Sequence, residues 1–96
     1  AQNSEAFDIM VEIAQLMNKY DLLNIVVKID VSNTDKVMAY VNNIEINLGD
    51  MSNGDQKIRT MGEVVKNINP NDRGTLDLSD LSKTVVFKYL TWLEMF

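Results

Sequence analysis

The chain has 96 residues, 46% of them hydrophobic and 24% charged, a composition that suits one globular domain and excludes a disordered tail. Fourteen acidic residues against nine basic ones give a formal net charge of −5, and an acidic domain repels the phosphate backbone of nucleic acids. Because the sequence holds neither His nor Cys, imidazole catalysis, thiol nucleophiles, disulfides and the usual zinc sites are excluded.

The first predicted element is a helix over residues 4–19. Ser4 can cap its first turn, and the positive end of the helix dipole there stabilises the negative charges of Glu5 and Asp8. Apolar residues then recur at spacings of three and four, namely Phe7, Met10, Ala14 and Met17. They are flanked by further apolar residues, Ile9, Ile13, Leu16 and Tyr20. A stripe of this width indicates a helix that is pressed against a sheet.

Three strands are predicted next, because the period of the apolar residues changes to two. They cover residues 25–31, 37–41 and 44–48. A turn cluster at residues 32–35 separates the first two strands, and Asn42-Asn43 separates the last two. Asn tolerates the positive φ that a two-residue hairpin turn requires. The three strands should therefore form an antiparallel meander with one apolar face.

A second helix should begin at residues 52–55, where Ser52 or Asp55 can cap the first turn. Its apolar face is made of Ile58, Met61, Val65 and Ile68. The helix should end at Asn69-Pro70, because the residue before a proline is pushed out of the α region. A short strand over residues 75–78, a turn over 79–83 and a last strand over 84–89 follow.

These elements predict an α+β fold, in which a mostly antiparallel sheet of about five strands has two helices packed on it. The expected order is α-β-β-β-α-β-β, in a single domain or fragment over residues 1–96. Nine of the last twelve residues are apolar, so we expect the tail to pack on its own domain or on a partner.

No stretch of this sequence approaches the roughly 18–20 apolar residues that span a bilayer, and we expect no signal peptide within it. Since the chain begins at Ala1 rather than at Met, we expect it to be cut from a longer protein. A membrane would then be reached only through an anchor that lies outside these residues.

Candidate catalytic and metal sites in the sequence are weak. Residues 69–80 have the length of a calcium loop, with Gly74 at the sixth position and Asp80 at the twelfth, but Arg73 brings a guanidinium into the ligand set. The acids are spread singly over helix starts and loops, and the neighbours Ser82 and Lys83 point apart. We therefore expect no catalytic site, metal, cofactor or small-molecule substrate.

One motif pattern runs through the predicted strands and the second helix. Its parts are Ile29-Asp30, then Ile44-x-Ile46-x-Leu48-Gly49-Asp50, then Lys57 with Met61 and Val65, and finally Gly74-x-Leu76-Asp77-Leu78-Ser79 before an aromatic strand. The pattern resembles the C-terminal part of the extracytoplasmic β domain of the bacterial cell-division family FtsQ, called DivIB in Gram-positive bacteria. The resemblance covers residues 25–87, and the helix over residues 4–19 fits the one that precedes this segment. Residues 91–96 depart from the family pattern, and the family's membrane span and POTRA domain are missing.

The resemblance implies a non-catalytic scaffold at the division septum, in which a single-pass anchor in the cell membrane holds this domain on the extracytoplasmic side. Family members hold two partners, FtsL and FtsB, the latter called DivIC in Gram-positive bacteria. They are reported to receive an FtsB-type segment as an added strand along the last strand. The corresponding residues here are Thr84, Val85, Val86, Phe87, Lys88 and Tyr89. Trp92, which lies in the tail outside the resemblance, is a further candidate contact with the partner. The residues favour this independently, because a late apolar strand can form a sheet edge that invites strand addition.

Several residues of the motif pattern also have plainer roles. Asp77 is either a recognition residue or, as we rather expect, a carboxylate that ties a turn or pairs with Lys57. Gly49 and Gly74 are expected to serve backbone turns. Trp92 either anchors the tail on the domain or contacts a partner.

Three alternatives to a division scaffold stay open. They are a generic extracytoplasmic adaptor, a fragment completed by dimerisation through its own tail, and a small carboxylate enzyme. A deep pocket that holds two acids of perturbed pKa would favour the enzyme. A sheet without such a pocket and with one open edge would favour the scaffold.

Overall fold

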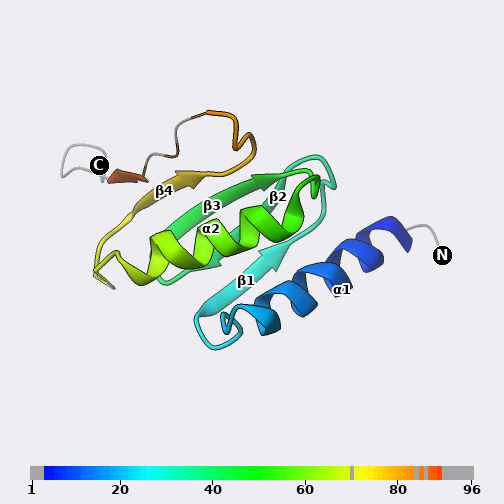
Figure 1. Cartoon of the computed structure of the whole chain (residues 1–96), viewed down its shortest axis with the longest axis horizontal. Coiled ribbons are helices and arrows are strands. Elements are labelled where there is room, and N and C mark those ends of the chain that lie inside the picture. Colours follow the sequence, from blue (N-terminus) through cyan, green and yellow to red (C-terminus); the bar gives the residue numbers. More distant parts are fainter. Residues whose placement is uncertain (1–3, 70, 84, 86, 90–96) are drawn as a thin grey trace.

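The computed structural model describes residues 4–69, 71–83, 85 and 87–89 as two helices and a five-stranded sheet (Figure 1). The helices are α1 (Ser4–Lys19) and α2 (Gly54–Lys66). The strands are β1 (Val26–Asp30), β2 (Val37–Val41), β3 (Ile44–Gly49), β4 (Gly74–Asp77) and β5 (Phe87–Tyr89). The predicted α+β fold and its element order are confirmed.

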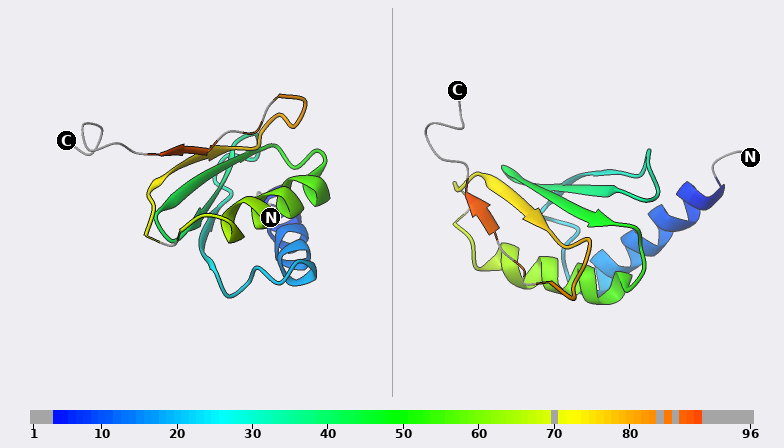
Figure 2. Two further views of the ribbon diagram at one scale, coloured as in Figure 1. Left: turned by 60° about the vertical axis from the view of Figure 1, so that its left-hand side comes forward. Right: turned by 90° about the horizontal axis from the view of Figure 1, so that it is seen from above.

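The sheet has the order β1-β2-β3-β4-β5, and every neighbouring pair is antiparallel except β3 and β4. β1, β2 and β3 form the predicted meander. β3 and β4 run parallel and are joined through α2, which supplies the long crossover that parallel neighbours need. Both helices lie against the same face of the sheet (Figure 2). The opposite face, called the open face below, is covered by none of the described elements.

The core lies between the helices and the sheet, and it follows from the alternation of the strand sequences. In β2 and β3 every second side chain is buried, and the side chains between them point to the open face. α2 buries Ile58, Met61 and Val65 of the predicted face, whereas Ile68 lies beyond the end of the helix and is half-buried. α1 buries only Ile13 and Met17 of its stripe. The buried hydrophobic residues are Ile13, Met17, Leu22, Val37, Ala39, Val41, Ile44, Ile46, Leu48, Ile58, Met61, Val65, Leu76 and Leu78.

The turn between β2 and β3 has the predicted backbone conformation. Asn42 adopts a φ of 53°, and the hairpin pairs Val41 with Ile44 directly across it. In contrast, β1 departs from simple alternation. Its register against β2 shifts between Val26 and Lys28, a bulge that leaves the side chain of Val27 72% exposed.

The start of α2 differs from the prediction. The N-cap is Asn53, with a φ of 55° and no side-chain capping bond, and not Ser52 or Asp55. Both predicted caps have other partners. The hydroxyl of Ser52 donates to Asp50 Oδ1 at 2.5 Å. The carboxylate of Asp55 accepts from Lys19 Nζ at 2.7 Å and from the Tyr20 hydroxyl, and so it joins α2 to the end of α1.

The end of α2 comes before the predicted Asn69-Pro70. The last helical residue is Lys66, and Asn67 forms the C-cap, with its backbone N–H donating to the carbonyls of Val64 and Val65. The Asn67 side-chain amide also donates to the Glu63 carbonyl at 2.8 Å. This local hydrogen bonding by the Asn67 side chain favours the end of the helix here, so α2 ends before the residues whose backbone Pro70 would restrict.

Lys57 is the one buried charged residue in the part of the chain that the structure describes, with 1% of its surface exposed. Its Nζ donates to the Asp50 carbonyl oxygen at 2.6 Å and lies 3.5 Å from Asp50 Oδ1. A buried ammonium needs such partners, because an uncompensated charge in the core costs several kcal/mol. Lys57 therefore ties α2 to the loop that leaves β3.

Candidate partner-binding edge

β5 lies at one edge of the sheet, as predicted for the last strand. It pairs antiparallel with β4, with Gly74 opposite Tyr89, Thr75 opposite Lys88 and Leu76 opposite Phe87. Of the proposed binding residues, Val85 and Phe87 are half-buried against the core, and Lys88 is exposed. Phe87, Lys88 and Tyr89 are consecutive residues of β5, so their backbone lies along this edge. Thr84, Val86 and Trp92 lie outside the described residues, as does the whole tail over residues 90–96.

Two consecutive Asp-x-Ser turns lead the chain from β4 to β5. Asp77 Oδ1 accepts from the Ser79 backbone N–H at 2.9 Å and from its hydroxyl at 2.6 Å. Asp80 Oδ1 accepts in the same way from Ser82, at 3.0 and 2.6 Å. These bonds, the hydroxyl bond first, hold the pKa of both carboxyl groups below the usual value. Asp77 therefore ties a turn, and its other predicted role, pairing with Lys57, is wrong because Lys57 is bound to Asp50.

Gly74 has a different role from the one predicted. It has no positive φ, but a Cβ at this position would overlap the carbonyl oxygen of Lys88 and the ring of Phe87. Gly74 is thus needed because β5 approaches β4 so closely at this point. Gly49 adopts a φ of 65° and serves a turn as predicted, and a Cβ there would also overlap Ser79.

A row of side chains crosses the open face and ends at β5. Successive pairings place Lys28 opposite Tyr40, Tyr40 opposite Glu45, Glu45 opposite Thr75 and Thr75 opposite Lys88. The Lys28 ammonium lies 5.6 Å from the centre of the Tyr40 ring, a cation–π distance. Beside this row the face has a shallow hollow of about 210 Å³, whose lining combines Lys36, Glu45 and Asp77 with the apolar side chain of Met38. The row itself brings charged side chains to the open face.

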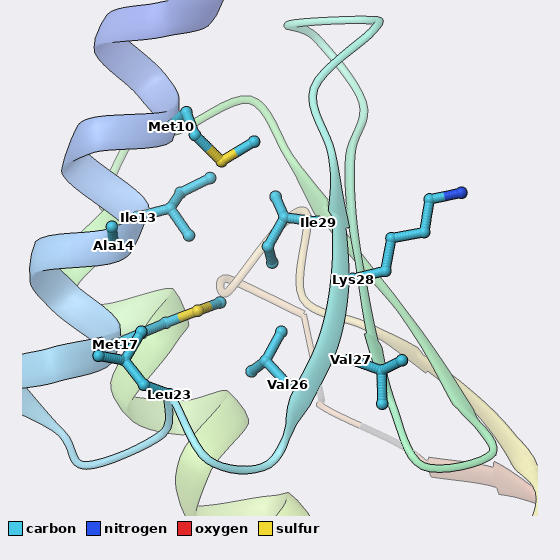
Figure 3. Close-up of a pocket in the computed structure, with 9 residues that line it drawn as sticks. All are labelled: Met10, Ile13, Ala14, Met17, Leu23, Val26, Val27, Lys28 and Ile29. Atoms are coloured by element: carbon cyan, nitrogen blue, oxygen red, sulfur yellow. The ribbon is translucent and has the colours of Figure 1, made fainter.

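The opposite edge, at β1, carries an apolar surface that the sequence did not predict. Figure 3 shows Met10, Ile13 and Met17 of α1 facing Val26 and Ile29 of β1 across a groove of about 270 Å³. Val27 and Lys28 point away from the helix because of the bulge (Figure 3). The large hydrophobic residues exposed on the described part of the chain all lie on α1, β1 or the loop between them: Phe7, Met10, Val11, Leu23 and Val27. Of these, Met10 and Leu23 line the groove, and an exposed apolar groove is a candidate interaction surface.

The described residues contain neither a cluster of side chains that could hold a metal ion nor a helix that could cross a bilayer. Within residues 4–69, 71–83, 85 and 87–89, no three His, Cys, Asp or Glu side chains gather closely enough to hold a metal ion. The side chain of Asn69 bonds locally instead, accepting from the backbone N–H of Asn71 at 2.9 Å. Neither α1 nor α2 has the length and apolar character of a bilayer-crossing helix.

No protein-family model, no curated protein and no solved structure matches this chain. The resemblance to the FtsQ/DivIB family therefore depends on the sequence motifs alone. The structure adds the positions of those motifs: the glycine of the closing motif lies where β5 meets β4, and its Asp-x-Ser forms the first turn between these strands.

We predict that Gly74→Ala loosens β5 from the sheet. The added methyl group meets backbone at Lys88, which cannot rotate away, so we expect a loss of about 1–3 kcal/mol in the free energy of unfolding. Chemical denaturation measures the loss, and faster amide exchange at residues 87–89 than in β2 would locate it.

The matched control is Gly62→Ala in α2. There the nearest neighbours of the new methyl group are the terminal carbons of Leu22, at 3.1 and 3.2 Å, which must shift by a few tenths of an ångström, and Ala is the better helix former, so the loss of stability should be smaller than for Gly74→Ala. If Gly74→Ala has the same free energy of unfolding as Gly62→Ala, and the amides of residues 87–89 exchange equally slowly in both, the close approach of β5 does not depend on this glycine.

Proposed function

We propose that this chain is a non-catalytic scaffold domain of bacterial cell division, similar to the C-terminal part of an FtsQ/DivIB β domain. It binds a segment of an FtsB/DivIC-like protein as an added strand along β5, in an assembly that also includes an FtsL-like protein. The domain works on the extracytoplasmic side of the cell membrane at the division septum, and the parent protein carries the single-pass anchor.

The observation that carries this proposal is the position of β5. It is the last strand of the sheet order and pairs with β4 on one side. An edge strand presents backbone N–H and C=O groups in the spacing that an incoming strand needs, so main-chain bonds can supply affinity. The half-buried Phe87 holds the strand on the core, while Lys88 stands on the open face. A sheet edge of this kind fits a scaffold.

The features of the described residues do not favour the carboxylate enzyme. The carboxylates with lowered pKa, among them Asp30, Asp50, Asp77 and Asp80, owe the shift mainly to hydrogen bonds from a Ser two residues further on. These are turn contacts at exposed sites. A catalytic pair needs instead two carboxyl groups whose pKa values are pushed apart in a shared cleft.

The test is to place Pro at two neighbouring positions of β5, Phe87 and Lys88. Of two successive strand residues, one directs its N–H towards the neighbouring strand and the other away from it. We therefore expect one Pro variant to lose binding of the FtsB/DivIC-like segment while its melting temperature stays near that of the parent. The other should lower the melting temperature, because it breaks a bond between β4 and β5.

Titration calorimetry with the FtsB/DivIC-like segment, beside a thermal melt, measures both effects. Phe87→Ala and Lys88→Ala are the matched controls, because they remove the same side chains and keep the N–H group. If both Pro variants stay folded and bind as tightly as their Ala controls, β5 is not the docking edge and the proposal fails.

Self-association is the second candidate function, and the apolar surface on α1 and β1 favours it. Phe7 and Val27 are 69% and 72% exposed, so neither is buried by the domain itself. If a second copy covers this surface, sedimentation should show a dimer that becomes a monomer in Phe7→Asp and Val27→Asp. Gln56→Asp, which adds the same charge on exposed α2, should leave the dimer intact. A parent chain that stays monomeric at high concentration would remove this candidate.

A further inference from the structure

Charged side chains are arranged in a defined order across the open face, and the last of them is on the edge strand β5. Along the row of five paired residues, cations stand at the two ends, on Lys28 and Lys88, and the acid Glu45 stands in the middle. Lys28 lies over the Tyr40 ring. Lys88 has the neutral Thr75 opposite it on β4. The ion pairs among the described residues, Lys19 with Asp55 and Lys57 with Asp50, do not include it.

A strand added beside β5 would extend this row by one residue. Directly paired residues of neighbouring strands share a face, so the side chain opposite Lys88 must also lie on the open face. The residues on either side of it must lie on the other face, where Phe87 packs against the core. The incoming strand thus meets a cation at one position and apolar surface at a flanking position.

We infer that Lys88 selects the partner strand: it requires an acidic residue at the position opposite itself, next to an apolar residue opposite Phe87. This inference rests on the proposed function, since it specifies the partner of the same edge. An opposite-charge pair across strands is stabilising, and a like-charge pair is destabilising, so one residue both favours the acid and disfavours a base.

The same cation disfavours pairing of β5 with another copy of itself. In an antiparallel pair centred on Lys88, the two ammonium groups would lie directly opposite each other, which is unfavourable. Lysine on an exposed edge is a common device against such pairing. An acidic partner strand removes the penalty, so Lys88 can protect the edge and still admit the right partner.

The experiment uses a synthetic peptide of the FtsB/DivIC-like segment encoded in the same genome, and a set of peptides in which each acid is replaced singly by Lys. Lys88→Glu should weaken the binding of the unchanged peptide by about threefold to tenfold, the range expected when one cross-strand pair turns from attraction to repulsion. One peptide of the set, in which Lys replaces the acid opposite Lys88, should bind the parent chain more weakly than the unchanged peptide does. The same peptide should bind the Lys88→Glu variant more tightly than it binds the parent chain. Higher salt should reduce both effects.

Lys36→Glu is the matched control. Lys36 is also an exposed lysine beside the open face, and its reversal changes the net charge equally, but it precedes β2, which β3 and β4 separate from β5. It should leave the affinity unchanged. Should a thermal melt show that Lys88→Glu does not fold, Lys88→Gln takes its place, with a smaller expected loss.

The outcomes separate this inference from the proposed function. If the unchanged peptide binds but Lys88→Glu and Lys36→Glu bind it equally, the selective role of Lys88 is wrong while strand addition stands. A loss with Lys88→Glu that no acid-to-Lys peptide restores also overturns the inference. If neither the peptide nor the whole extracytoplasmic part of the partner binds the parent chain, the proposed function fails and this inference fails with it.

Discussion

The parallel pairing of β4 with β3 decides where the rest of the chain can lie. It is closed at both ends by backbone bonds, from Gly74 N–H to the Asn43 carbonyl at 3.3 Å and from Leu78 N–H to the Asn47 carbonyl at 2.8 Å. Parallel neighbours need a long crossover, which α2 provides, and the buried Lys57 fastens the start of this crossover to the loop after β3. Because β3 already lies on one side of β4, the following strand, which pairs with β4 on the other side, forms the edge of the sheet.

The two edges of the sheet have different physical characters, although both belong to short strands. β1 is bulged and continues into the apolar groove against α1, whereas β5 is three residues long and carries a lysine on the open face. Bulges, short strands and lysines all limit unwanted pairing at an edge. The β5 edge therefore suits a partner that meets a charge requirement, and the β1 edge suits one that covers apolar surface.

The sequence predicted the features that depend on local periodicity and missed those that depend on distant contacts. The change from a period of 3.6 to a period of two placed all seven elements, and Asn42 marked the hairpin turn. Nothing local showed that Asp55 would bond to Lys19 and leave the N-cap to Asn53, or that Lys57 would be buried. The role of Gly74 was missed for the same reason, because it arises from the approach of a strand thirteen positions later.

The central claim is that β5 receives a partner strand, and contacts between backbone protons in the complex test it most directly. With this chain and the FtsB/DivIC-like segment labelled differently, isotope-edited nuclear Overhauser spectra report only contacts between the two. The account predicts a regular strand pattern between the segment and residues 87–89, with slowed amide exchange there on binding. Contacts confined to the open face or to the groove between α1 and β1, with residues 87–89 unchanged, would contradict it.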